Sequence, residues 1–187
     1  MTSIASLRAR LTHILLNDSI CADALRVVKG LDLPDCWIAA GLVRDAVWNW
    51  LHDRPPNSPM GDIDIIWHDP SRSNAAFDRA MEQQLNALRP GLPWSIKNQA
   101  RMHLRNGDPP YRSASDAMRY WPETATATAV RMTSDGRLDI EAPFGLEDLF
   151  APRLVPTPAF TGNRRPTFDR RVHDKEWLSR YPLLDRG

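Results

Sequence analysis

Two aspartates stand one residue apart in the segment Asp62-Ile63-Asp64-Ile65-Ile66-Trp67. Acidic and apolar positions alternate at its start, which is typical of a short strand, and residues i and i+2 of a strand point to the same face. The two carboxylates would then lie side by side, with their backbones about 6–7 Å apart. Such a pair suits Mg²⁺ or Mn²⁺, which completes its shell with water and substrate phosphates. An isolated Asp-x-Asp is nevertheless more often a pair of solvated aspartates.

The upstream segment Ala40-Gly41-Leu42-Val43-Arg44-Asp45 favours the metal-binding interpretation. A strand that ends in glycine at the start of a helix exposes backbone N–H groups to a phosphate. Arg44, in the first helical turn, adds a bidentate phosphate donor. Asp45 beside it is placed to accept a hydrogen bond from Arg44 or to orient it. Gly41 and Arg44 are therefore predicted to bind substrate.

These two segments resemble the DNA polymerase β nucleotidyltransferase superfamily, in particular the catalytic heads of CCA-adding enzymes and bacterial poly(A) polymerases. Those heads carry a Gly-Gly-x-Val-Arg-Asp turn followed by Asp-x-Asp. The present chain has Ala40 in place of the first glycine, and a proline-rich loop lengthens the gap between Gly41 and Asp62. The resemblance implies that Asp62 and Asp64 hold a catalytic metal ion.

The second half is similar to a narrower group of small bacterial nucleotidyltransferase-like proteins whose function is unassigned. The likeness covers roughly residues 37–156. Besides the glycine turn and the Asp-x-Asp, it lies in three segments: Lys97-Asn98-Gln99-Ala100-Arg101-Met102-His103, Trp121-Pro122-Glu123-Thr124-Ala125-Thr126 and Ala142-Pro143-Phe144-Gly145-Leu146-Glu147-Asp148-Leu149-Phe150. Resemblance to this group does not identify a substrate.

The superfamily pattern implies a third carboxylate on a neighbouring strand, and two residues compete for it. Asp139 lies in the middle of a predicted strand, but Arg131 directly opposite would make an ordinary cross-strand ion pair with it. Glu123 begins the preceding predicted strand, where it would otherwise be a surface glutamate. Both remain candidates, with Glu141 a distant third.

Trp94–Leu104 alternates between apolar and polar residues and is predicted to be one strand. On its polar face, Lys97 and Arg101 would neutralise triphosphate oxygens, and His103 would contact the sugar or base. Asn98 interrupts the apolar face, where burial demands hydrogen-bond partners, and is predicted to contact substrate too. The alternative is the solvated face of an antiparallel strand.

The remaining pattern predicts an α/β (α+β) fold, with a mixed, mainly antiparallel sheet flanked by helices. Apolar residues recur at helical spacing over residues 4–15, 24–31, 43–51 and 77–88, and Ser113 or Ser115 would cap a short helix that reaches Trp121. Residues 36–40 and the β-branched stretch Thr124–Thr133 are predicted strands.

Patterning also selects a three-residue loop, Ser134-Asp135-Gly136, for a predicted hairpin. That loop pairs Met132 with Leu138 and Val130 with Ile140, whereas a two-residue loop would turn every apolar side chain to the wrong face.

Residues 1–151 are predicted to form the catalytic domain, and residues 152–187 a proline-rich arm on the same domain. The arm would be extended and end in a short helix near Trp177. Its clusters Arg164-Arg165 and Arg170-Arg171 are more typical of a solvated surface than of an RNA-binding site.

The composition suits one domain of 187 residues, of which 42% are hydrophobic. Its 24 basic and 23 acidic residues nearly cancel, so no global field draws it to nucleic acid or to a membrane. Cys21 and Cys36 lack metal-ligand spacing, and no apolar run approaches a membrane span. A reduced cytoplasmic protein is expected.

Together these observations predict an enzyme that transfers an NMP from an NTP to an acceptor hydroxyl and releases pyrophosphate. The acceptor, whether RNA, protein or small molecule, and the preferred base stay open. The alternative is a nucleotide-binding or partner-binding module of the same fold that has lost turnover.

Overall fold

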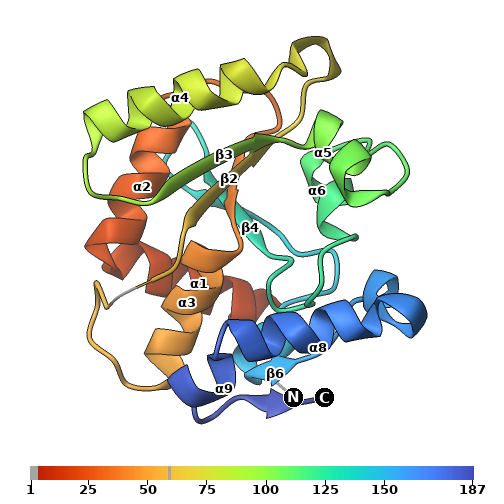
Figure 1. Ribbon diagram of the computed structural model, residues 1–187. Coiled ribbons are helices and arrows are strands. Elements are labelled where there is room, and N and C mark those ends of the chain that lie inside the picture. The colour runs from red at the N-terminus through yellow and green to blue at the C-terminus, as the bar shows by residue number, and fades with distance from the viewer. Residues whose placement is uncertain (1–3, 59) are drawn as a thin grey trace.

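The computed structural model describes residues 4–58 and 60–187. Within them the chain folds into three layers, a central sheet with helices on both faces (Figure 1). The helices are α1 (Ile4–Asn17), α2 (Ser19–Lys29), α3 (Gly41–Leu51), α4 (Ala75–Leu88), α5 (Gln99–Asn106), α6 (Ala114–Met118), α7 (Glu147–Phe150), α8 (Arg165–Asp174) and α9 (Trp177–Arg180). Short 3₁₀ turns occupy Pro70–Arg72, Pro158–Phe160 and Gly162–Arg164.

The strands are β1 (Trp37–Ala39), β2 (Ile63–Trp67), β3 (Trp94–Asn98), β4 (Ala129–Met132), β5 (Leu138–Glu141), β6 (Arg153–Leu154) and β7 (Asp185–Arg186). The main sheet has the order β3-β2-β1-β4-β5, in which only β2 and β3 run parallel. The predicted fold class, a mixed and mainly antiparallel sheet flanked by helices, is confirmed. The predicted hairpin register is confirmed as well, because Met132 faces Leu138 and Val130 faces Ile140.

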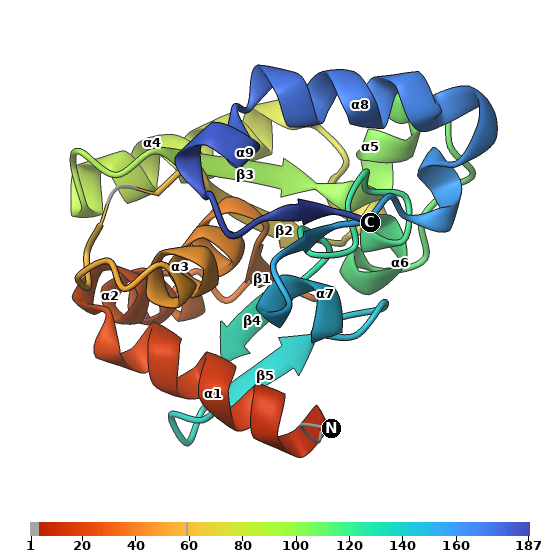
Figure 2. The same ribbon diagram turned by 90° about the horizontal axis from the view of Figure 1, so that it is seen from below.

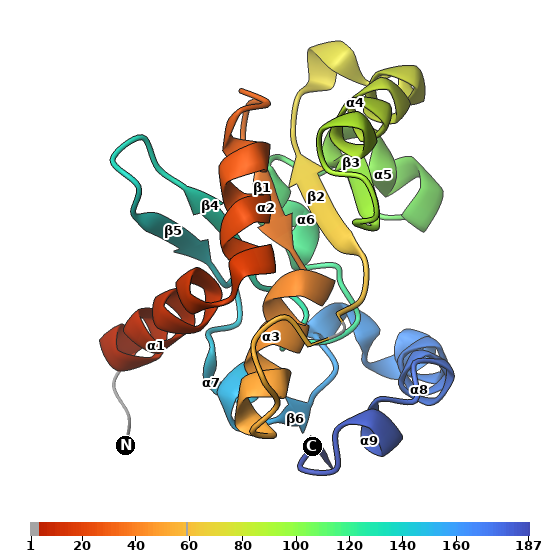
Figure 3. The same cartoon turned by 90° about the vertical axis from the view of Figure 1, so that its left-hand side faces the viewer.

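Strand alternation sends the apolar side chains of the main sheet into two clusters, one on each face. Ile38, Ile65 and Ile96 point to the face covered by α2, α3 and α4, where the larger cluster lies. Ala39 and Ala129 point to the opposite face, where a smaller cluster includes residues of α6. Figure 3 shows α2 in front of β1, with α4 and β3 to one side and β5 and α1 to the other.

Three predicted elements are wrong. The predicted strand over Trp94–Leu104 ends at Asn98, whose side chain accepts from the Ala100 N–H and starts α5 instead. The predicted strand over Thr124–Thr133 begins only at Ala129. The residues before it form turns instead, in which the Thr126 and Ala127 N–H groups donate to the Glu123 carbonyl.

The third wrong element is the extended C-terminal arm, which contains the ten-residue helix α8 before the predicted short helix α9. The arm joins the larger core cluster through Phe168, Val172, Trp177 and Tyr181, and β7 pairs in parallel with β6. Figure 2 shows α8 and α9 along one side of the molecule, and Figure 1 shows the C-terminus close to β6. No helix in the described part of the chain has both the length and the apolar character that a membrane crossing requires.

Candidate active site

The two aspartates lie where β2 begins beside the β1–α3 turn. Asp64 is in β2 directly opposite Ala39 of β1, and Asp62 immediately precedes the strand. Asp62 is exposed, whereas Asp64 is half-buried. Since positions i and i+2 share a face, both carboxylates are presented on the face opposite the larger core cluster. The isoleucines between and after them, Ile63 and Ile65, anchor the strand in that core.

The surroundings of Asp64 disfavour ionisation of its carboxyl group. Burial raises the pKa of its carboxyl above the ordinary value, and the negative charge of Asp62 raises it further. Arg44, the Gly41 backbone N–H that bonds to the carboxylate, and Arg171 each lower the pKa without reversing the shift. A cation bound beside this carboxylate would favour its ionised form.

The turn between β1 and α3 is tightly built. Ala40 has φ +52° and ψ −115°, a conformation that side chains rarely adopt. A Cβ added to Gly41 would lie 2.6 Å from the carbonyl oxygen of Asp62, so only glycine fits there. The glycine of this turn is therefore required by the close approach of β2.

We expect Ala40→Gly to leave the free energy of unfolding unchanged or to raise it by up to about 1 kcal/mol. The substitution relieves backbone strain, which stabilises the fold, but it also removes one buried methyl group. Gly41→Ala should lower it by about 1–3 kcal/mol, because the new methyl overlaps the Asp62 carbonyl. Urea unfolding of both variants measures the two changes. Destabilisation by Ala40→Gly as large as that by Gly41→Ala would contradict the strain argument.

Arg44 is locked rather than free. Its Nε and Nη2 donate to Asp45 Oδ1 at 2.9 and 2.6 Å, and its Nη1 donates to Thr126 at 3.4 Å. Its guanidinium carbon lies 4.5 Å from the Trp177 ring centroid and 5.1 Å from that of Trp48. With 5% of the residue exposed, Arg44 has its hydrogen-bonding capacity committed within the protein. Its charge still acts on Asp64.

Asp45 holds several segments together at this point. It is fully buried, and besides Arg44 it accepts from the Gly61 N–H at 2.9 Å, in the loop just before Asp62. Arg180 Nη2 of the C-terminal segment lies 3.9 Å from Asp45 Oδ2, the oxygen that accepts from Gly61. One carboxylate thus interacts with the first turn of α3, with the loop before β2 and with the C-terminal segment.

A cavity of about 250 Å³ opens next to Asp64. It lies on the sheet face that carries Asp64 and Ile66, and it is closed by residues of α5, of the segment before β4 and of α8. Its polar lining residues are Asp64, Lys97, Gln99, Asn106, Thr126 and Arg171. The cavity thus combines an acidic wall with two basic side chains.

Of the four residues predicted to contact substrate from this strand, only Lys97 lines this cavity, and its Nζ donates to Glu82 at 2.6 Å. Asn98 is fully buried and bonds to the backbone of Asp69, Arg72 and Ala100. Arg101 pairs with buried Asp78 of α4. His103 packs edge-on against Tyr111. The shared strand face is wrong, because the backbone turns into α5 after Asn98.

The acids of the β4–β5 hairpin lie far from the pair. Asp64, Ala39, Ala129 and Glu141 form one row across four strands, so Glu141 is three strand spacings, about 14 Å, from Asp64. Asp139 lies further along β5, and its Oδ2 is 2.9 Å from Arg131 Nη2 with both side chains nearly half exposed. The ion pair considered as the alternative role of Asp139 is therefore present.

Neutralising this acid by Asp139→Asn should leave nucleotide transfer unchanged and cost at most about 1 kcal/mol of unfolding free energy. The reason is that an exposed ion pair on an outer strand contributes little and lies away from Asp64. Steady-state transfer rates and urea unfolding test both parts. A collapse of activity with retained stability would restore Asp139 as the third acid.

Glu123 is placed differently. Its side chain is fully buried, its Oε1 accepts from Arg171 Nε at 2.9 Å, and its Oε2 has no hydrogen-bond partner among the described residues. It does not line the cavity, whereas Arg171 does. Within residues 4–58 and 60–187, no group of three or more His, Cys, Asp or Glu is arranged to hold a metal ion.

Sequence reasoning missed Arg171, Gln99 and Thr126 as cavity residues. Arg171 was weighed only as part of a basic run, and its helix was predicted to be extended. The available signals were Pro166 in the first turn of α8 and the i, i+4 spacing of Phe168 and Val172.

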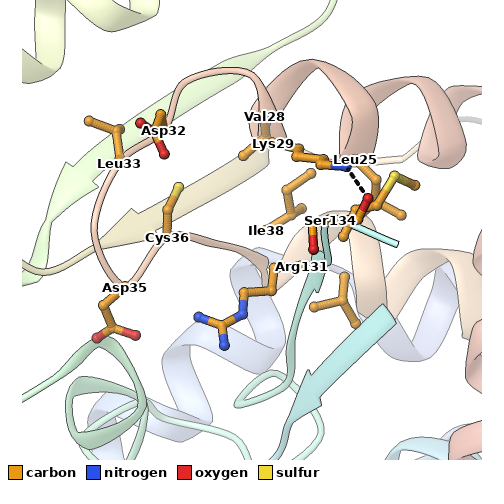
Figure 4. A pocket seen from close by; sticks show the side chains of 12 residues that line it. Leu25, Val28, Lys29, Asp32, Leu33, Asp35, Cys36, Ile38, Arg131 and Ser134 are labelled. Carbon is orange, nitrogen blue, oxygen red and sulfur yellow. Dashed lines mark hydrogen bonds between the residues drawn. The ribbon is translucent and has the colours of Figure 1, made fainter. Parts of the chain in front are cut away.

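A second cavity, of about 270 Å³, lies between α2, the loop before β1 and strand β4 (Figure 4). Its sheet-side residues Ile38 and Val130 belong to the larger core cluster, on the face opposite Asp64. Several of its polar residues have partners in the protein: Lys29 donates to the Ser134 carbonyl, and Asp35 accepts from Trp37 and Ala114. Burial raises the pKa of the Cys36 thiol to about 12, so this thiol is unreactive.

A mixed sheet with paired aspartates at the start of β2, set beside a strand–glycine turn–helix unit, defines a nucleotidyltransferase of the DNA polymerase β type. The chain belongs to the nucleotidyltransferase family, whose sequence profile matches residues 26–185. The predicted superfamily is thereby confirmed.

Solved structures agree with this assignment. An NMR structure described as revealing a CCA-adding enzyme head domain is 30% identical, with a TM-score of 0.85, and the match covers 96% of this chain and 95% of that one. Among curated proteins, none matches the chain significantly.

Two longer proteins share the fold at lower identity. A tRNA-processing enzyme in an apo form is 13% identical with a TM-score of 0.56, and a CCA-adding enzyme in complex with ATP is 14% identical with a TM-score of 0.55. The matches cover 90% and 95% of the present chain but only 43% and 42% of theirs. The chain therefore corresponds to less than half of each.

Proposed function

We propose that the protein transfers an NMP from an NTP to an acceptor hydroxyl. The acceptor oxygen bonds to the α-phosphorus, the bond from that phosphorus to the β-phosphate bridging oxygen breaks, pyrophosphate leaves, and the hydroxyl proton passes to solvent. The observation that carries the proposal is the Asp62–Asp64 pair, of which Asp64 lines a cavity, in a chain that belongs to the nucleotidyltransferase family.

The donor set fits Mg²⁺ or Mn²⁺. Both are hard cations that prefer carboxylate oxygens and keep several waters or phosphate oxygens. Asp62 and Asp64 offer such oxygens, and a bound cation would offset the burial and the mutual repulsion that raise the pKa of Asp64. These two residues would hold the ion, which would supply neutralisation of phosphate charge.

The other residues of the site position and shield the reactants. The Gly41 N–H and Arg44, itself held by Asp45, both favour the ionised form of the Asp64 carboxyl. Lys97 and Arg171 give the cavity wall its positive charge, which suits a polyphosphate. Met102, Trp121 and Pro122 contribute apolar surface to the cavity.

The absence of a three-acid group among the described residues favours a second candidate, a module that binds nucleotide without turnover. Both candidates predict nucleotide binding at the Asp64 cavity. They differ in whether pyrophosphate is released.

The test incubates the purified protein with each α-³²P-labelled NTP, Mg²⁺ or Mn²⁺, and in turn an RNA, a protein and a small-molecule fraction of a cell extract. We expect label in one fraction, matched by pyrophosphate and lost on addition of EDTA. The Asp64→Asn variant is the background control. Nucleotide binding without label in any fraction, with either metal, would replace the enzyme by the binding module.

A further inference from the structure

The cavity beside Asp64 has two basic lining residues, and they differ in what they have left to offer a ligand. Lys97 Nζ already donates to Glu82 at 2.6 Å and to the Ile96 carbonyl at 2.9 Å. Arg171 uses its Nε for Glu123, and neither of its Nη nitrogens has a hydrogen-bond partner among the described residues. A guanidinium with free terminal nitrogens is suited to bidentate recognition of phosphate.

Arg44, the arginine of the glycine turn, has no such capacity. All three of its nitrogens bond within the protein, and the ring centroids of Trp177 and Trp48 lie 4.5 and 5.1 Å from the guanidinium carbon. Its Nε and Nη2 are held by the buried Asp45 carboxylate, only 5% of the residue is exposed, and it does not line the cavity. Arg171 is about one-third exposed and faces the cavity, so a ligand reaches it directly.

Glu123 explains how Arg171 is held. Its buried carboxylate fixes Arg171 Nε, and the Trp177 ring centroid lies 5.4 Å from the guanidinium carbon. The backbone around Glu123 is itself fixed, because Thr124 N–H bonds to the Val155 carbonyl and Thr157 N–H to the Pro122 carbonyl. The guanidinium is thus oriented before any ligand binds, which lowers the entropic cost of binding.

We propose that Arg171 of the C-terminal helix binds the triphosphate of the nucleotide, and that Glu123 is the positioning residue that holds it rather than a metal ligand. This inference rests on the proposed function for the identity of the ligand. It assigns the phosphate contact to the arm instead of to the arginine of the glycine turn.

The test measures binding of inorganic tripolyphosphate by calorimetry, in EDTA, so that neither metal nor turnover is needed. Arg171→Met keeps the packing on Trp177 and should weaken binding about 10- to 100-fold, the loss expected for charge-assisted hydrogen bonds. Arg170→Ala is the matched control, since Arg170 is an exposed arginine on the same helix and should change nothing. Arg171→Lys, which retains charge without the fork, should fall between parent and Arg171→Met.

Transfer kinetics and metal binding give a second, independent readout. Arg171→Met and Glu123→Gln should raise KM for the NTP more than they lower kcat, with Mg²⁺ affinity unchanged. Circular dichroism confirms that each variant is folded. A loss of Mg²⁺ affinity in Glu123→Gln, or tripolyphosphate binding as weak in Arg170→Ala as in Arg171→Met, would overturn the inference.

Failure of the proposed function gives a different result. A parent protein that binds tripolyphosphate through Arg171 but transfers no nucleotide upholds the inference and removes the activity. An active parent whose KM and tripolyphosphate affinity are unchanged by Arg171→Met removes the inference alone.

Discussion

Asp62→Asn and Asp64→Asn should each reduce nucleotide transfer by more than about 100-fold, because each removes one of the two carboxylates proposed to hold the metal ion. The metal-free variants should be as stable as the parent or more stable, since substitution relieves repulsion between the two acids. Transfer assays and thermal unfolding in EDTA measure the two effects. Turnover within about tenfold of the parent would remove these residues from the reaction.

The stability effect has a defined dependence on pH. The pKa of Asp64 is raised in the folded protein, so its ionised form disfavours folding. This destabilisation is complete above the folded pKa and disappears as the pH falls below the ordinary aspartate value. The Tm advantage of metal-free Asp64→Asn over the parent should therefore be largest near neutral pH and shrink on acidification. An advantage that grows on acidification would contradict the assigned shift.

Asp45→Ala should cost about 3–5 kcal/mol of unfolding free energy, because it leaves Arg44 as an uncompensated buried charge. The same change also frees the Gly61 N–H next to the Asp62 loop, so transfer activity should fall with stability. Urea unfolding measures the loss. Asp139→Ala, which breaks an exposed aspartate–arginine pair, is the matched control and should cost at most about 1 kcal/mol.

A double variant separates the buried charge from the lost contacts. Arg44→Met/Asp45→Ala removes both charges and should recover part of the stability lost in Asp45→Ala. If the double variant is less stable than Asp45→Ala, the loss comes from packing and from the Gly61 contact instead.

The parts of the site that the sequence predicts are those set by local periodicity. The strand–turn–helix at Gly41 and the strand after Asp62 follow from alternation, helical spacing and a glycine, each read within a few residues. The hairpin register also follows from local pattern, because only one loop length buries Val130 and Ile140 together.

What the sequence did not predict depends on partners distant along the chain. Asp78 of α4 binds Arg101, so an arginine expected to contact phosphate is paired within the protein. The bond from Arg44 to the adjacent Asp45 is predicted, but the packing of Arg44 on Trp177 of the C-terminal segment is not. The alternation of apolar and polar residues from Trp94 onward continues past the end of β3, so it predicts a longer strand. Asn98 at the N-cap and Gly107 at φ +67° mark the two ends of α5. Arg171 enters the cavity through the packing of α8, which no short-range spacing encodes.

The packing of the arm on α3 also bears on how the chain acquires its structure during synthesis. Trp48 of α3 meets Trp177 and Tyr181, and Arg54 donates to the carbonyl of Arg180, 126 positions later. Ribosomes release a chain from its N-terminus, so α3 is made long before the residues that cover its tryptophan. Contacts of such long sequence separation form slowly, and the uncovered apolar surface is open to aggregation meanwhile. Nascent chains of this protein should therefore depend on chaperones until the last residues emerge.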